Sequence, residues 1–215
     1  MSEDLEREKA AAARAAAELV ADGQRVGLGT GSTVAHLLPA LAARGLRDLR
    51  CVATSPATAS RARELGLPVE DFENLDRLDV AIDGADQVDA AGWLVKGGGG
   101  ALTREKIVAA AADRFVVIVD HTKVVAQVVA PVPLELLSFG LPATLRAVAP
   151  TRLRDVPHSP DGGLIADYQG EVGDPEALAR RFETVPGVID HGLFPPALTS
   201  DVLVARGEDV EHRRV

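Results

Sequence analysis

The first 120 residues alternate between short apolar segments and helix-favouring segments, and this alternation constrains the fold more than any other feature. We expect strands at 24–28, 49–54, 78–82, 93–96 and 115–119, and helices at 3–21, 34–43, 56–65 and 103–112. Strand and helix in regular alternation predict a parallel sheet with crossover helices. The run Phe115–Val119 is typical of a strand buried on both faces. The sequence therefore predicts an α/β fold with a Rossmann-like parallel sheet.

The pattern changes near Pro131. Beyond it, we expect strands at 132–137, 152–156, 164–168 and 188–193, with helices at 142–148 and 175–182. The order β-α-β-β-α-β predicts a smaller ferredoxin-like α+β domain. The apolar segment 202–205 predicts a strand that returns to the first sheet. We therefore expect a catalytic α/β domain made of residues 1–129 and 202–215, with residues 130–201 forming the ferredoxin-like domain.

Composition excludes several classes of protein. The net charge of −9 and only seven aromatic residues argue against a nucleic-acid binder, which needs cations for phosphates and rings for bases. The single cysteine, Cys51, excludes an intrachain disulfide and a multi-cysteine metal site. An Ala-rich start broken by Arg14, after an acidic N-terminus, resembles neither a membrane span nor a signal peptide. We expect a soluble, cytoplasmic protein with no nucleic-acid or membrane partner.

The first candidate site is the segment Gly27–Thr33, which reads Gly-Leu-Gly-Thr-Gly-Ser-Thr between a strand and a helix. Small residues let the backbone approach an anion, and the helix start offers N–H groups and a favourable dipole. No Lys precedes Ser32, so the segment is not a Walker loop, and it lacks the full dinucleotide fingerprint. We expect a phosphate monoester to bind at Thr30, Gly31, Ser32 and Thr33. The alternative is a tight turn in which Ser32 caps the helix.

The second candidate site is Asp83-Gly84-Ala85-Asp86, directly after the expected strand 78–82. Two carboxylates close together push their proton affinities apart, so that one can hold a proton while the other is ionised. A metal site with Asp89 as a third oxygen ligand is one alternative. A turn closed by solvated Asp residues is another.

The third candidate site runs from Lys96 through four consecutive glycines to Glu105. Four consecutive glycines usually mark a flexible linker. Here Gly97, Gly98 and Gly99 lie between an expected strand and an expected helix, which favours a loop that approaches a ligand closely. Glu105 falls in the first helical turn, where the dipole favours the ionised form that a general base needs. Ordinary helix electrostatics is the alternative. Since all three segments, and Lys123, follow strands, we expect them at the carboxyl edge of the parallel sheet.

Together these segments offer an anion cradle, a carboxylate pair, a lysine and a glutamate base. No Ser-His-Asp set is evident, and the five histidines show no metal-ligand spacing. This set of groups suits proton transfer next to the carbonyl of a small phosphorylated substrate, with Glu105 abstracting a carbon-bound proton. We expect no metal and no cofactor.

The three segments, in this order and spacing, resemble the A-type ribose-5-phosphate isomerases of the pentose phosphate pathway. The resemblance runs from about residue 5 to 205 and is strongest up to Lys123. It implies interconversion of D-ribose 5-phosphate and D-ribulose 5-phosphate through an enediol, without a metal.

The resemblance also implies a role for each matching residue. It makes Glu105 the proton acceptor and Asp83, with Asp86 beside it, the carboxylate that handles hydroxyl protons and ring opening. It makes Lys96 the cation near the oxyanion. The substrate contacts that it implies are Thr30–Thr33, Asp83–Asp86, Lys96–Gly99 and Lys123, and Lys9 aligns with a lysine near the phosphate. The partners that it implies are the sugar phosphate and further copies of the chain, in a homodimer or homotetramer.

Two alternatives of other classes remain at this point. A non-catalytic sugar-phosphate sensor shares this sheet, but it needs a helix-turn-helix of roughly 50–60 residues, and this chain reaches its first expected strand by Gln24. A related sugar-phosphate deaminase or lactonase would use a catalytic histidine, and none lies in the three segments.

Overall fold

The computed structural model describes residues 2–215, which divide into two compact units. Unit 1 comprises the residues up to Ala85, together with Arg104–Val124 and Ala197–Val215; unit 2 comprises Asp86–Thr103 and Val125–Pro196. This division differs from the expected boundaries, because residues 86–103 and 125–129 pack with the smaller unit and residues 197–201 with the larger one. Each unit has its own sheet and its own buried core.

The sheet of unit 1 has six strands in the order β13-β12-β6-β3-β1-β2. The strands are β1 (Arg25–Leu28), β2 (Arg50–Ala53), β3 (Val80–Asp83), β6 (Phe115–Asp120), β12 (Asp201–Arg206) and β13 (Asp209–Arg214). All neighbouring pairs are parallel except β12 with β13. The predicted parallel sheet is therefore confirmed, and so is the return of the 202–205 segment, which pairs with β6.

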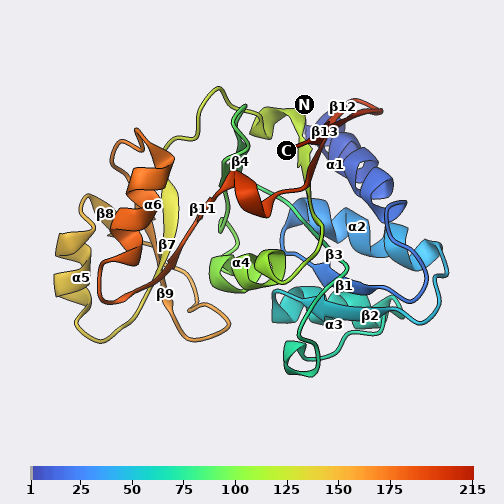
Figure 1. The fold of residues 1–215 in the computed structure, drawn as a ribbon, viewed down its shortest axis with the longest axis horizontal. Helices are drawn as coiled ribbons and strands as arrows, with labels where there is room; N and C mark the ends of the chain where they lie inside the picture. The colour runs from blue at the N-terminus through green and yellow to red at the C-terminus, as the bar shows by residue number, and fades with distance from the viewer. Residues whose placement is uncertain (1) are drawn as a thin grey trace. The chain divides into compact units, whose positions relative to one another are not determined.

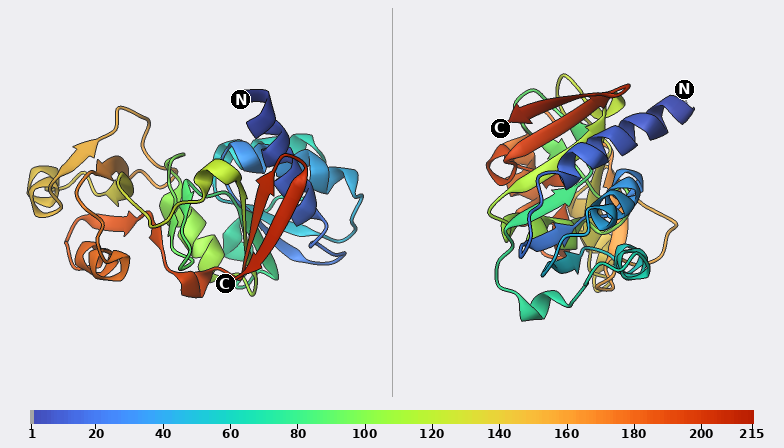
Figure 2. Two further views of the ribbon diagram at one scale, coloured as in Figure 1. Left: turned by 90° about the horizontal axis from the view of Figure 1, so that it is seen from above. Right: turned by 90° about the vertical axis from the view of Figure 1, so that its right-hand side faces the viewer.

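Helices cover both faces of this sheet. They are α1 (Ser2–Ala17), α2 (Ser32–Ala43), α3 (Pro56–Glu64) and α4 (Leu102–Ala110), the last of which begins in unit 2. Buried residues of α1 and α2 share one core with Val26 and Leu28 of β1, and α1 also runs along β12 and β13 (Figures 1 and 2). Between those two residues, Gly27 points to the other face, where a Cβ would lie 2.5 Å from Val108 of α4. Within residues 2–215, no helix is long and apolar enough to cross a membrane.

Unit 2 contains the predicted ferredoxin-like arrangement. Its elements are β7 (Val132–Leu136), α5 (Leu141–Ala147), β8 (Thr151–Leu153), β9 (Leu164–Tyr168), α6 (Pro175–Glu183) and β10 (Val188–His191). The four strands form an antiparallel sheet in the order β10-β7-β9-β8. Phe182 of α6 is fully buried against this sheet. Its ring packs edge-on to that of Tyr168, with 5.2 Å between the ring centroids.

A second sheet in unit 2 corrects one prediction. Its three strands, β4 (Gln87–Val88), β5 (Leu94–Val95) and β11 (Leu193–Phe194), are antiparallel and run in the order β11-β5-β4. We expected the segment before Lys96 to belong to the parallel sheet, and this is wrong. The short β4–β5 turn, closed by the Asp89 carboxylate, folds the two strands into a hairpin instead. Short connections join antiparallel strands, whereas parallel neighbours need long crossovers.

The amino edge of the parallel sheet is held by an ion pair between β1 and the residue before β3. The Asp79 carboxylate accepts hydrogen bonds from the Arg25 guanidinium at 2.7 and 3.2 Å and from the Arg25 backbone N–H at 2.7 Å. The hydrogen bonds from the Arg25 side chain, and to a smaller extent the one from its backbone N–H, lower the pKa of Asp79 to about 2. The carboxylate is therefore favoured in the folded chain.

We predict that Asp79→Asn destabilises the fold by about 1–2 kcal/mol at neutral pH, after allowance for solvent screening. Because the folded pKa lies below the unfolded value of 3.8, this contribution is complete above that value and is lost as the pH falls through about 2. Urea unfolding of both proteins should show a difference that falls by roughly half at pH 3. The exposed Asp155→Asn is the control. A difference independent of pH would contradict the assignment.

Candidate active site

The loop between β1 and α2 is built around two glycines. Gly31 precedes α2 with φ of 123°, a conformation that side chains disfavour, and its carbonyl accepts the Ala35 N–H. Gly31 is thus the N-cap, and the alternative in which Ser32 caps the helix is wrong. Ser32 and Thr33 instead begin the helix, where the first backbone N–H groups have no intrahelical acceptor and the dipole favours an anion.

Asp83 ties this loop to the end of β3. Its Oδ1 accepts the Thr30 N–H at 3.0 Å and the Gly84 N–H at 2.7 Å, and the side chain is only 3% exposed. Gly29 lies so close that a Cβ there would sit 2.0 Å from the Asp83 Cγ and Oδ1. The first candidate segment and Asp83–Ala85 of the second therefore form one structure in unit 1, since Gly84 also lies beside Thr33.

A network of hydroxyl groups supports the loop between β1 and α2, and this network was not predicted from the sequence. The Thr30 hydroxyl lies 2.7 Å from that of Thr54, and the Thr58 hydroxyl donates to the Gly29 carbonyl at 3.0 Å. Ser55, the N-cap of α3, donates to Thr58 at 3.0 Å. Thr54 and Ser55 directly follow β2, so the same strand-end rule that found Asp83 would have found them.

Glu105 lies in the first turn of α4 and is buried, with 3% of its surface exposed. Two residues earlier, the Thr103 hydroxyl donates to the Glu135 carboxylate at 2.5 Å. Glu135 is a fully buried residue of β7 that also accepts the Ser159 hydroxyl. The start of α4 is thus fixed within unit 2, and the helix continues from there through Glu105 in unit 1.

Lys123 ends a short 3₁₀ helix, His121–Lys123, which follows β6. Its start is capped by Asp120, which accepts the Thr122 N–H at 3.0 Å. Glu8 of α1 anchors the same turn, because its carboxylate bonds to the His121 ring at 2.6 Å and accepts the Gly207 N–H at 3.0 Å. Burial acts to raise the pKa of Glu8, but these hydrogen bonds outweigh it and lower the pKa. Lys123 thus sits at the carboxyl edge, as predicted.

Lys9, which the resemblance aligned with a phosphate-binding lysine, lies one residue after Glu8 on α1. Its Nζ pairs with Glu6 at 2.7 Å, and the side chain is 15% exposed. The pair with Glu6 lies along the helix itself. The structure therefore gives Lys9 a local carboxylate partner and leaves its role toward a ligand as a prediction.

Lys96 is held by unit 2. Its side chain is 2% exposed, and Nζ lies 5.6 Å from the ring centroid of Phe194. Its backbone N–H donates to the Gly192 carbonyl at 2.9 Å. A Cβ at Gly192 would meet the Lys96 carbonyl at 2.2 Å, so glycine is required there. Contacts with Gly192 and Phe194, which are distant from Lys96 in sequence, therefore fix the position of this residue.

Asp86 and the glycine run form a local structure in unit 2. The Asp86 carboxylate accepts the Gly98 N–H at 2.8 Å, and the Asp86 N–H donates to the Val95 carbonyl at 2.8 Å. Gly97 has a φ of 103°. Asp86 is exposed whereas Asp83 is buried, so the two carboxylates of the predicted pair lie in different environments with different backbone partners. The glycine run therefore forms a loop with defined hydrogen bonds, and it is not the flexible linker that was the alternative.

Other candidate groups are engaged elsewhere. Asp89, considered as a third metal ligand, uses its carboxylate to accept the N–H groups of Ala91 and Trp93 at 2.9 and 3.0 Å. No group of three or more metal-ligating side chains gathers within residues 2–215. Burial raises the pKa of Cys51 to about 12, so this thiol stays protonated. Its predicted inert character agrees with that environment.

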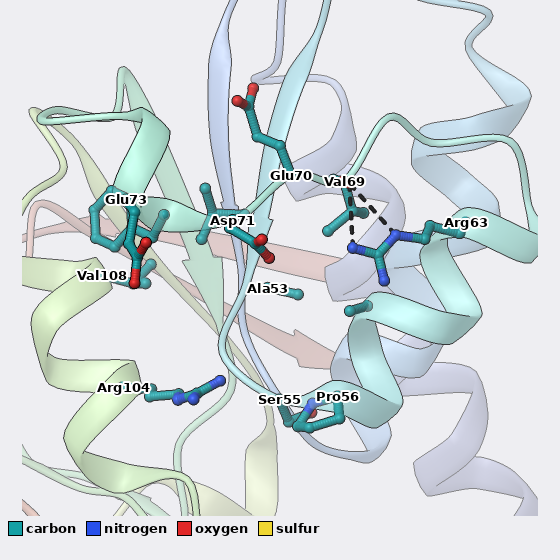
Figure 3. A pocket seen from close by; sticks show the side chains of 13 residues that line it. Ala53, Ser55, Pro56, Arg63, Val69, Glu70, Asp71, Glu73, Arg104 and Val108 are labelled. Carbon is teal, nitrogen blue, oxygen red and sulfur yellow. Dashed lines mark hydrogen bonds between the residues drawn. The ribbon is translucent and has the colours of Figure 1, made fainter. Parts of the chain in front are cut away.

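A cavity of about 410 Å³ opens in unit 1 (Figure 3). Its lining includes Ser55 and Pro56 at the start of α3, the segment from Val69 to Glu73, and Arg104 of α4. Arg104 points from α4 toward Ser55, so the cavity lies beside the hydroxyl network. The predicted site residues are not among those that line it.

Comparison with known proteins places this geometry in a family. Residues 50–209 match the family model for ribose 5-phosphate isomerase A (phosphoriboisomerase A). A ribose-5-phosphate isomerase A from Caulobacter vibrioides is 45% identical over 94% of this chain and 96% of its own length. The crystal structure of the ribose 5-phosphate isomerase A from Neisseria gonorrhoeae superposes with a TM-score of 0.93 at 29% identity, covering 98% of this chain and 97% of that one.

A third relative carries a ligand. The structure of a D-ribose-5-phosphate isomerase in complex with phospho-erythronic acid superposes with a TM-score of 0.91 at 34% identity, covering 98% of this chain and 99% of that one. The fold, the ordered loops and these likenesses define the chain as an isomerase enzyme. It belongs to the ribose 5-phosphate isomerase A family.

Proposed function

We propose that this protein interconverts D-ribose 5-phosphate and D-ribulose 5-phosphate by metal-free proton transfer, in the non-oxidative branch of the pentose phosphate pathway. Its likeness to the family over nearly the whole chain carries this proposal. The ligand of the solved relative supports the substrate class, because phospho-erythronic acid carries a carboxylate and a phosphate. Those two anionic groups mimic the enediolate and phosphate ends of a pentose phosphate intermediate.

In unit 1, we assign the proton transfer to Glu105 and Asp83. Glu105 takes the proton from C2 of the aldose, the electrons form an enediolate, and the proton returns at C1 to give the ketose. A positioned base of this kind contributes about 10²–10⁴-fold. Asp83 handles the proton of the substrate hydroxyl, which is supported by its burial and by the two backbone N–H groups that fix its Oδ1.

In unit 2, we assign oxyanion stabilisation to Lys96. Burial supports this role, since a cation interacts more strongly with a developing charge in a site from which water is excluded. Asp86 holds the loop through its bond to Gly98, and Gly97, Gly98 and Gly99 contact the substrate. No step of this scheme needs a cofactor.

For the phosphate, we propose Thr30–Thr33 and Lys123. The start of α2, directly after Gly31, supports this assignment. There Ser32 and Thr33 supply hydroxyl groups beside the first backbone N–H groups of the helix. The positive φ of Gly31 lets the chain enter the helix without a side chain in front of these groups. Lys123 adds a cation from the turn after β6.

A coupled assay that detects ribulose 5-phosphate formed from ribose 5-phosphate tests the proposed function. We expect turnover by the purified protein that persists in excess chelator. Loss of activity that added metal restores would instead make Asp83 and Asp86 metal ligands. Binding of ribose 5-phosphate without turnover would favour the sugar-phosphate sensor.

We also propose that the protein is cytoplasmic and forms a homodimer or homotetramer. The family resemblance supports both statements. The side chains of Leu137 and Phe139 in unit 2 add support for self-association, being 50% and 92% exposed. They border an apolar groove with Ala143 and Val185.

A further inference from the structure

One arginine outside the three candidate site segments binds the glycine loop of unit 2. Arg154 follows β8, and its Nη1 donates to the Gly97 carbonyl at 2.9 Å and to the Gly98 carbonyl at 3.1 Å. Carbonyls of successive residues in an extended chain point in opposite directions. Here two of them converge on one nitrogen, which is possible because Gly97 adopts a φ of 103°.

Asp167 of β9 holds the guanidinium in place. Its two carboxylate oxygens accept Nε at 2.8 Å and Nη2 at 2.6 Å, in the bidentate geometry that gives an ion pair direction as well as strength. The side chains of Arg154 and Asp167 are 18% and 20% exposed. The Arg154 N–H also bonds to the Ile165 carbonyl at 2.9 Å, so both partners are fixed to the same pair of strands.

The loop is thereby held through both kinds of backbone group. The Gly98 N–H donates to Asp86, while the Gly98 carbonyl accepts from Arg154. The Gly97 carbonyl accepts from Gly100 N–H at 3.1 Å as well as from Arg154. A carbonyl that accepts from a guanidinium directs its negative end at that cation, whereas a carbonyl directed at an anionic ligand would repel it.

We propose that Arg154, oriented by Asp167, is a positioning residue that sets the carbonyls of the substrate loop away from the bound sugar phosphate. This inference rests on the proposed function, in which Gly97–Gly99 contact the substrate. Lys96 is anchored separately through Gly192 and Phe194. Loss of Arg154 therefore weakens substrate binding more than it slows the chemical step.

The test is steady-state kinetics of Arg154→Met, Arg154→Lys and the control Arg152→Met. Arg152 lies on β8, two residues before Arg154, and is exposed. Because two hydrogen bonds from a charged group to the loop are lost, we expect the KM of Arg154→Met to rise about 10–100-fold while kcat changes less than about 3-fold. Arg154→Lys, which keeps the charge but not the fork, should restore only part of the affinity. The control should match the wild type.

Binding of phospho-erythronic acid, measured by calorimetry, should weaken by the same factor as KM rises. A purely structural role would lower the active fraction, so kcat would fall with KM unchanged, and that result would overturn the proposal. An unchanged KM and kcat would overturn it too. Turnover by the wild type is measured first, so an inactive wild type would count against the proposed function and not against Arg154, whose effect on ligand binding would still be read by calorimetry.

Discussion

Glu105→Gln is expected to lower kcat by about 10²–10⁴-fold, with KM for ribose 5-phosphate nearly unchanged. Glutamine keeps the size of the side chain and its place in the first turn of α4, but it cannot accept a proton from carbon. Because Glu105 is buried, substitution by a residue of similar volume should preserve the fold. Coupled kinetics and thermal unfolding of the purified variant measure the two effects separately.

The matched control for this experiment is Glu176→Gln. Glu176 also lies in the first turn of a helix, α6, but its side chain is 60% exposed and pairs with Arg180. If helix electrostatics alone explained Glu105, the two variants would behave alike. Activity above a tenth of the wild-type value in Glu105→Gln would show that another group is the base.

Asp83→Asn is expected to reduce kcat by at least about 100-fold while leaving the loop in place. The Asn Oδ1 can still accept the N–H groups of Thr30 and Gly84, so the substitution removes the charge and the proton-handling group without removing the anchor. Asp83→Ala removes both. It should also lower the free energy of unfolding by about 1–3 kcal/mol, because two backbone donors lose their acceptor.

Asp89→Asn is the control for the Asp83 pair of variants. Asp89 is buried and, like Asp83, accepts two backbone N–H groups through one oxygen, but it closes the β4–β5 turn. We expect it to keep most of its activity. Equal loss of activity in Asp83→Asn and Asp83→Ala is compatible with a proton-handling role, whereas near wild-type activity in Asp83→Asn would assign Asp83 to loop anchoring alone.

Most of the architecture was predictable because its signals are local. The strand–helix alternation fixed the parallel sheet of unit 1, and the β-α-β-β-α-β order predicted the ferredoxin-like sheet. β13 was missed because it is an edge strand of mostly charged and exposed residues, Asp209–Arg214, without an apolar face. The expected strand 188–193 is split at Gly192, since β11 leaves β10 to pair with β5 almost 100 residues earlier. Periodicity carries no information about such distant pairing.

The same distinction applies to the candidate site. Residues at strand ends or in glycine runs stand out in the sequence, which is why Asp83, Lys96 and Lys123 could be named as candidates. Arg154 lies in a segment with no recognisable motif, and its importance depends on Asp167 and on carbonyls more than 50 residues away. Long-range backbone contacts of this kind become visible only in three dimensions.

The place of β12 within its sheet has a consequence for how fast the two sheets form. β12 lies between β6 and β13, so a strand made of residues 201–206 completes a sheet begun at residue 25. The four-stranded sheet of unit 2 is complete once residue 191 has been made. Contacts between distant residues form slowly because a large loop must close first. The six-stranded sheet therefore depends on contacts between residues more distant in sequence than those of the unit 2 sheet, and we expect it to form more slowly.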